Sequence, residues 1–66
     1  MIKIYNVKIQ AESGEKKLEF VEVVEYYISY REECIREAVR ESKAVKQVKE
    51  KMPWLRNVRA ISSISP

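Results

Sequence analysis

The 66-residue chain carries few side chains that could do covalent chemistry. It has ten glutamates and one cysteine, but no histidine and no aspartate. Without histidine, neither a Ser-His-Asp nor a Cys-His nucleophile can be assembled. A pair of glutamates could act as acid and base, but only in a cleft, which a chain this short hardly encloses. The single glycine also excludes a glycine-rich phosphate loop. We therefore expect no enzyme activity, no catalytic residue and no cofactor.

Cys34 is the one candidate nucleophile, and two interpretations compete for it. It falls in the first turn of a predicted helix near Arg31, where the helix dipole and a cation would favour the thiolate. It also shares an apolar stripe with Ile35 and Ala38, and free cysteine is among the most buried residue types. We favour the buried role. One thiol and no histidine also exclude an internal disulfide and predict no metal site.

Basic residues gather in the second half of the chain. The net charge is −1 over residues 1–30 and +4 over residues 31–66. Cations beside an aromatic ring can pair with phosphates while the ring stacks on a base, so a nucleic acid or nucleotide is one possible partner. Lysines also commonly solvate a helix, tryptophan often closes a small core, and no known nucleic-acid-binding motif is present. The candidate anion-binding residues are Lys43, Lys46, Lys49, Trp54, Arg56 and Arg59.

Three tyrosines, Tyr26, Tyr27 and Tyr30, stand within five positions. On an alternating strand Tyr26 and Tyr27 must point to opposite faces of the sheet. Only one of them can then join a core beneath a helix. The other lies on a face that the chain does not cover, and tyrosine is enriched in protein interfaces.

Two strands are predicted to position these rings. Residues 2–11 alternate between apolar and polar, with Tyr5 to Ala11 placing an apolar side chain on one face at every second position. Ile2 and Ile4 fall on the opposite face, so either a bulge lies near Tyr5 or the sheet is apolar on both sides there. A turn around Gly14 leads into a second strand over residues 18–28. Its two faces carry Leu18, Phe20, Val24, Tyr26 and Ile28 on one side and Val21, Val23 and Tyr27 on the other.

A helix should follow the second strand. Residues 29–32 have the Ser-x-x-Glu spacing of a capping box, which predicts a helix start at Ser29. Two apolar stripes, at residues 34–42 and 45–52, are turned by about a quarter revolution from each other. We therefore predict a kink or break near Ser42, which would act as a second N-cap. Pro53 ends the helix, and a third strand alternates through Val58, Ala60, Ser62 and Ile64.

The predicted fold class is α+β, in one domain spanning residues 1–66 with the element order β-β-α(α)-β. An antiparallel sheet in the order 2-1-3, with the helix on one face, is the simplest topology. The other face has no cover within the chain, and apolar residues on such a face usually mark an interface. We expect a homo-oligomer. The predicted interface residues are Ile2, Ile4, Val21, Val23, Tyr27 and Trp54.

The same sequence argues against a membrane location. Its apolar runs are far shorter than the ~20 residues that span a bilayer. Lys3 and Lys8 interrupt any apolar leader at the start. We expect a cytoplasmic protein.

The whole chain, from MIKIYNVKIQ through the single-glycine turn to EKMPWLRNVRAISSIS, resembles the small β-β-α-β accessory proteins that bacteriophages encode. The resemblance rests on layout and implies no catalytic residue. It implies an inhibitor-like accessory protein in the host cytoplasm, binding a host protein, a defence component or a signalling nucleotide. Two classes of function stay open. One is a self-associating interaction protein, and the other is a binder of nucleic acid or nucleotide through the basic half.

Overall fold

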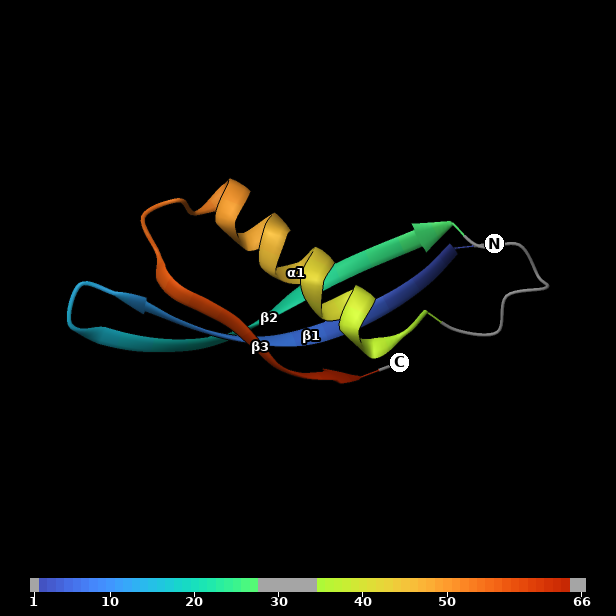
Figure 1. Ribbon diagram of the computed structural model, residues 1–66, viewed down its shortest axis with the longest axis horizontal. Coiled ribbons are helices and arrows are strands. Elements are labelled where there is room, and N and C mark those ends of the chain that lie inside the picture. The colour runs from blue at the N-terminus through green and yellow to red at the C-terminus, as the bar shows by residue number, and fades with distance from the viewer. Residues whose placement is uncertain (1, 28–34, 65–66) are drawn as a thin grey trace.

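The computed structural model describes residues 2–27 and 35–64, with the side chains of Ser63 and Ile64 left aside. Three antiparallel strands form one sheet in the order β2-β1-β3, and one helix crosses a single face of it (Figure 1). This arrangement confirms the predicted fold class and strand order. The elements are β1 (Ile2–Ser13), β2 (Lys16–Tyr27), α1 (Glu37–Lys51) and β3 (Arg56–Ile64).

Strands β1 and β2 form one long hairpin with an uninterrupted register from Ile2 opposite Tyr27 to Ser13 opposite Lys16. Gly14 in the turn has a φ of 62°, a conformation that glycine adopts without a steric penalty. Because the register has no bulge near Tyr5, the first of the two sequence alternatives is excluded. The sheet is apolar on both faces at the Ile2 end.

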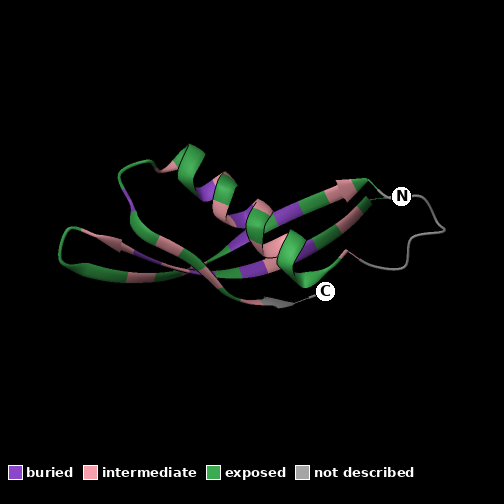
Figure 2. Ribbon diagram, viewed as in Figure 1, coloured by how far each residue is buried: buried purple, intermediate pink, exposed green. Residues whose placement is uncertain are grey.

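The core lies between α1 and the face of the sheet that it covers, which we call the inner face (Figure 2). From Tyr5 to Ala11 every second residue of β1 is buried there, as the period of two predicts. Leu55 is buried at the end of this core, whereas Trp54 beside it is 63% exposed, so Trp54 is not the closing residue. The buried apolar side chains are Tyr5, Val7, Ile9, Ala11, Val24, Ala44, Val48 and Leu55.

The helix differs from the prediction in where it starts and in its continuity. Ile35 and Arg36 precede the helix, and α1 runs from Glu37 through Ser42 without a break. The predicted break and the second N-cap at Ser42 are therefore wrong, and the alternative of a kink stays a prediction. The physical reason is that the first predicted stripe is not a buried helical stripe, since Ile35 lies outside the helix and Val39 is exposed. The predicted capping box at 29–32 and Cys34 lie outside the described residues.

Strand β3 pairs with β1 as expected, but with two register shifts. Ala60 lies opposite Ile9 on the inner face, whereas Ser62 lies opposite Lys8, whose side chain belongs to the other face. The shift between these pairs interrupts the predicted alternation, because a bulge adds one residue to one strand. Ser62 therefore faces the other side of the sheet from Ala60.

Candidate interaction surfaces

The face of the sheet that points away from α1, the outer face, carries an exposed apolar patch. The register places its members on cross-strand neighbours of β1 and β2. Each of them is classed as an exposed large hydrophobic side chain, and Tyr27 is 85% exposed. These are five of the six predicted interface residues, brought together as expected. We call this set the outer apolar patch: Ile2, Ile4, Val21, Val23 and Tyr27.

The patch runs along the hairpin as a series of cross-strand rows. Ile2 faces Tyr27 at the open end, and the following rows each combine one apolar and one polar residue. Glu25 stands opposite Ile4, and Lys8 stands opposite Val21 at the far end. Lys8 also approaches Glu19, with 3.9 Å between the amine and a carboxylate oxygen. Both side chains are half exposed, so this pair contributes little to stability.

Trp54, the sixth predicted interface residue, lies elsewhere. It sits in the turn between α1 and β3. That turn is at the opposite end of the sheet from the N-terminal end of β1, where Ile2 and Tyr27 meet (Figure 1). Trp54 is exposed, but the structure does not bring it to the outer apolar patch.

The two described tyrosines of the central stretch point to opposite faces, as predicted. The Tyr26 hydroxyl donates to the Val39 carbonyl of α1 at 3.2 Å, and its ring meets Tyr5 edge-on with 6.2 Å between centroids. The Lys43 amine lies 4.2 Å from the centroid of the Tyr26 ring. Burial raises the pKa of Tyr26, which Arg40 partly opposes. Tyr26 therefore helps to hold α1 on the sheet, and only Tyr27 is available to a partner; Tyr30 lies outside the described residues.

The predicted anion-binding residues divide into cations that donate to other parts of the chain and cations that do not. Lys43 donates to the Glu25 carbonyl, and Arg56 donates to the Gly14 carbonyl. Arg59 donates from Nε to the Gln10 side-chain oxygen at 2.9 Å. Within the part of the chain that the structure describes, Lys46 and Lys49 make no hydrogen bond or ion pair. The cations are thus divided between structural contacts along the sheet and two free lysines on the helix.

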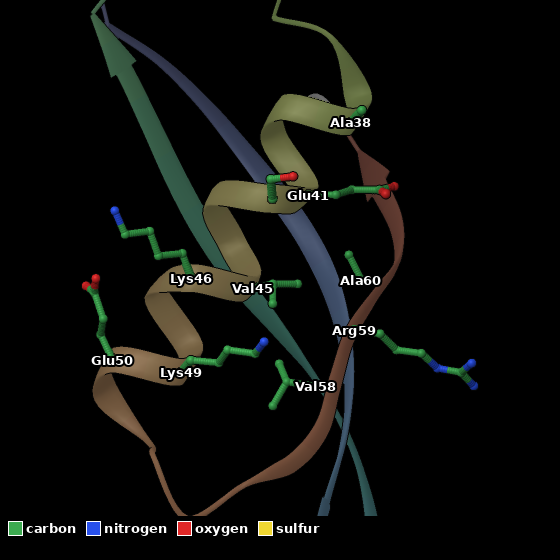
Figure 3. Close-up of a pocket in the computed structure, with 10 residues that line it drawn as sticks. Ala38, Glu41, Val45, Lys46, Lys49, Glu50, Val58, Arg59 and Ala60 are labelled. Carbon is green, nitrogen blue, oxygen red and sulfur yellow. The ribbon is translucent and has the colours of Figure 1, made fainter.

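A groove of about 750 Å³ lies between α1 and β3. Figure 3 shows Val45 of α1 opposite Val58 and Ala60 of β3, with Lys49 reaching toward the strand and Arg59 pointing away. The groove therefore has apolar walls and charged rims. Its lining residues are Ala38, Glu41, Ser42, Val45, Lys46, Lys49, Glu50, Val58, Arg59 and Ala60.

Glu22 is an important residue that the sequence analysis did not single out. Its side chain is on the inner face and only 5% exposed. The carboxylate accepts from Gln47 at 2.9 Å and from Lys51 at 2.7 Å, so its charge is paired. The period of two places position 22 on the same face as Phe20 and Val24, so the alternation alone could have predicted that Glu22 lies on the inner face. Its helix partners are 25 and 29 positions away, which no local pattern encodes.

Two other classes of site were sought in the described residues. Among residues 2–27 and 35–64, no three histidine, cysteine, aspartate or glutamate side chains group as metal ligands would. No helix in that part of the chain has the length and apolar character needed to cross a membrane.

Comparison of the chain with protein-family models, with curated proteins and with solved structures gave no match. The resemblance to phage accessory proteins therefore stays a prediction.

Proposed function

We propose that this chain is a non-enzymatic interaction protein that self-associates through the outer apolar patch. The observation that carries the proposal is the patch itself, in which five large apolar side chains on neighbouring strands face solvent. Contiguous apolar surface of this kind is uncommon on monomers and usually marks a contact site. A second copy of the chain is the occupant that we propose.

The accessible surface of the chain is large for its mass, which is compatible with a contact to a second copy. A compact monomer of 7.8 kDa exposes about 4,400 Å². This chain exposes 4997 Å², which is about 600 Å² more. Its radius of gyration of 12.7 Å also exceeds the value of about 11 Å for a compact chain of this length. The chain is therefore less compact than a typical monomer of its size and exposes more surface to a partner.

The charges around the patch are compatible with a symmetric pair. A two-fold axis running across the strands at Val23 would place the Glu25 row of one copy against the Lys8 row of the other. Glu25 and Lys8 of the second copy would then face each other across the space between the two sheets, offset sideways by about one strand spacing. Val23 would meet Val23 at the axis. The one acid inside the patch thus gains an opposite charge instead of being buried unpaired.

Self-association is tested by changing Val23 to lysine and measuring molar mass by sedimentation equilibrium. Val23 and Val39 are exposed to a similar extent, 46% and 48%. Because Val39 is on α1 and outside the outer apolar patch, Val39→Lys is the matched control. We expect Val23→Lys to weaken the dimer by at least about tenfold, because each copy loses a buried valine and gains a buried charge. Val39→Lys should behave as the unchanged chain. A monomeric unchanged chain, or equal dissociation constants for all three, would contradict the proposal.

A heterologous partner, such as the host protein or defence component that the resemblance implies, also stays a prediction. Nucleic-acid binding has less support, because Lys43, Arg56 and Arg59 already donate within the chain. Light scattering with a short single-stranded oligonucleotide tests it. A phosphate-driven complex would weaken by orders of magnitude between about 50 and 200 mM salt, whereas apolar association would change little.

A further inference from the structure

The two edge strands of the sheet differ in whether other parts of the chain hydrogen-bond to their main-chain groups. At the β2 edge, Gln47 donates to the Val23 carbonyl at 3.0 Å and Lys43 donates to the Glu25 carbonyl. At the β3 edge, residues 56–62 have no main-chain hydrogen bond to any described residue outside β1. An edge strand points alternate N–H and C=O groups outward, so β3 offers unpaired groups to another strand.

The sequence of β3 does little to prevent such pairing. Proteins usually protect an edge with charges, proline or bulges. The two arginines of β3 and its first register shift lie before Ala60. The second register shift lies between Ala60 and Ser62. Residues 62–64, Ser-Ser-Ile, lie beyond both register shifts and contain no charge and no proline. This run is therefore the part of the edge that is open to a new strand.

The helix beside this edge carries a self-complementary set of side chains. Glu41, Val45 and Lys49 follow one another at intervals of four residues and line the groove next to β3 (Figure 3). Residues four apart lie on one face of a helix. A two-fold rotation reverses their order, so the acid of one copy faces the base of the other and valine stays near the axis.

We propose that β3 pairs antiparallel with β3 of a second copy, so that two three-stranded sheets continue as one six-stranded sheet. The two helices then lie on the same side of it, and Glu41 faces Lys49 of the second copy. This contact is separate from the outer apolar patch. If both contacts form, the assembly is a tetramer in which two six-stranded sheets pack through their outer faces.

The test uses Val23→Lys as the background, because it removes the outer contact. In sedimentation equilibrium at low salt, this variant should still be a dimer. Adding Lys49→Glu should weaken that dimer roughly tenfold, since two attractive pairs become repulsive. Adding Glu41→Lys as well should restore the dissociation constant to within about threefold. Lys16→Glu, the same charge change at the exposed first residue of β2, is the control and should have no effect.

The outcomes separate the two contacts. A Val23→Lys chain that is monomeric overturns the β3 contact and leaves the outer contact standing. An unchanged chain that assembles no further than the Val23→Lys dimer contradicts the outer contact instead. Absence of an effect of Lys49→Glu, or of rescue by Glu41→Lys, also overturns the β3 contact.

A second measurement does not depend on the charge variants folding. In the Val23→Lys chain, amide hydrogens over residues 56–64 should exchange more slowly as the concentration rises through the dissociation constant. Exchange that is independent of concentration would overturn the proposal.

Discussion

The inner and outer faces of the β1–β2 hairpin come from the same two strands and have different surroundings. On the inner face, α1 covers the apolar side chains and also supplies the partners of the one buried carboxylate, Glu22. In the described part of the chain, no buried side-chain polar atom is left without a hydrogen bond. On the outer face, apolar side chains of similar size remain exposed. Apolar alternation therefore identifies both faces, and the helix alone decides which one becomes the core.

The largest expected difference between the faces comes from truncating one valine on each. Val24 is fully buried and Val21 is 58% exposed, and both are on β2. We expect Val24→Ala to lower the free energy of unfolding by about 2–3 kcal/mol, because it removes buried methyl groups and leaves a cavity. Val21→Ala should change it by less than about 0.5 kcal/mol in the monomer. Urea unfolding in the Val23→Lys background, at concentrations below the dissociation constant of the β3 dimer, measures both. Equal losses would mean that the outer face is packed within the monomer.

A smaller difference is expected from the two glutamates. Glu22→Gln keeps the shape of the inner side chain but removes the charge that Lys51 and Gln47 contact. We expect a loss of about 1–2 kcal/mol, because hydrogen bonds to a charged group are stronger than neutral ones. Glu25→Gln, three positions along on the outer face, should leave the unfolding free energy of the monomer almost unchanged. Thermal unfolding is sufficient, since 1 kcal/mol shifts the midpoint of a small domain by about 4–8 °C.

The two tyrosines give the next comparison. Tyr26→Phe removes the hydroxyl that donates to the Val39 carbonyl, and we expect a loss of about 1 kcal/mol. Tyr27→Phe changes an exposed hydroxyl and is the control, with an expected change of less than about 0.5 kcal/mol. Denaturant unfolding at neutral pH measures both. A larger loss for Tyr27→Phe would show that the ring is held by contacts within the monomer.

The smallest expected effect is on the pH dependence of the unfolding free energy, which should differ between variants at Tyr26 and Tyr27. Burial raises the pKa of Tyr26 in the folded chain above its ordinary value of 10.0. As pH rises, Tyr26 therefore loses its hydroxyl proton in the unfolded chain before it does so in the folded chain. The contribution of Tyr26 to the unfolding free energy is fully present below pH 10 and is lost as pH rises through the higher folded pKa. We expect the unfolding free energy to fall less steeply above pH 10 in Tyr26→Phe than in Tyr27→Phe. Parallel curves would contradict the assignment.

The sequence allowed the strands, their order and the outer apolar patch to be predicted, because a period of two assigns each residue to a face. The positions of Tyr26 and Tyr27 follow from that rule, and so does the patch. The same rule places Glu22 inside, but hydrophobicity argues against a buried glutamate until Lys51 and Gln47 are known to lie above it. Such pairings depend on how the helix lies across the sheet.

The start of α1 at Glu37 could not be predicted from local signals. The Ser-x-x-Glu spacing that predicted a start at Ser29 lies outside the described residues, and the described helix begins after Arg36, whose side chain makes no capping hydrogen bond. Helix starts are set by tertiary contacts as well as by capping. Here the Tyr5 hydroxyl accepts from the Ile35 N–H at 3.1 Å, and Arg40 lies over the Tyr5 ring. The register shift between Ala60 and Ser62 likewise has no signature in an uninterrupted strand sequence.

The side chains that α1 places on the β2 carbonyls also bear on the order of folding. Gln47 and Lys43 reach these carbonyls only when the helix is docked. Before docking, the hairpin has two open edges, and each can recruit another chain. Helix docking and edge-to-edge association should therefore compete during refolding. The rate of docking is independent of protein concentration, whereas the rate of association increases with it, so the refolding yield should fall as the concentration rises.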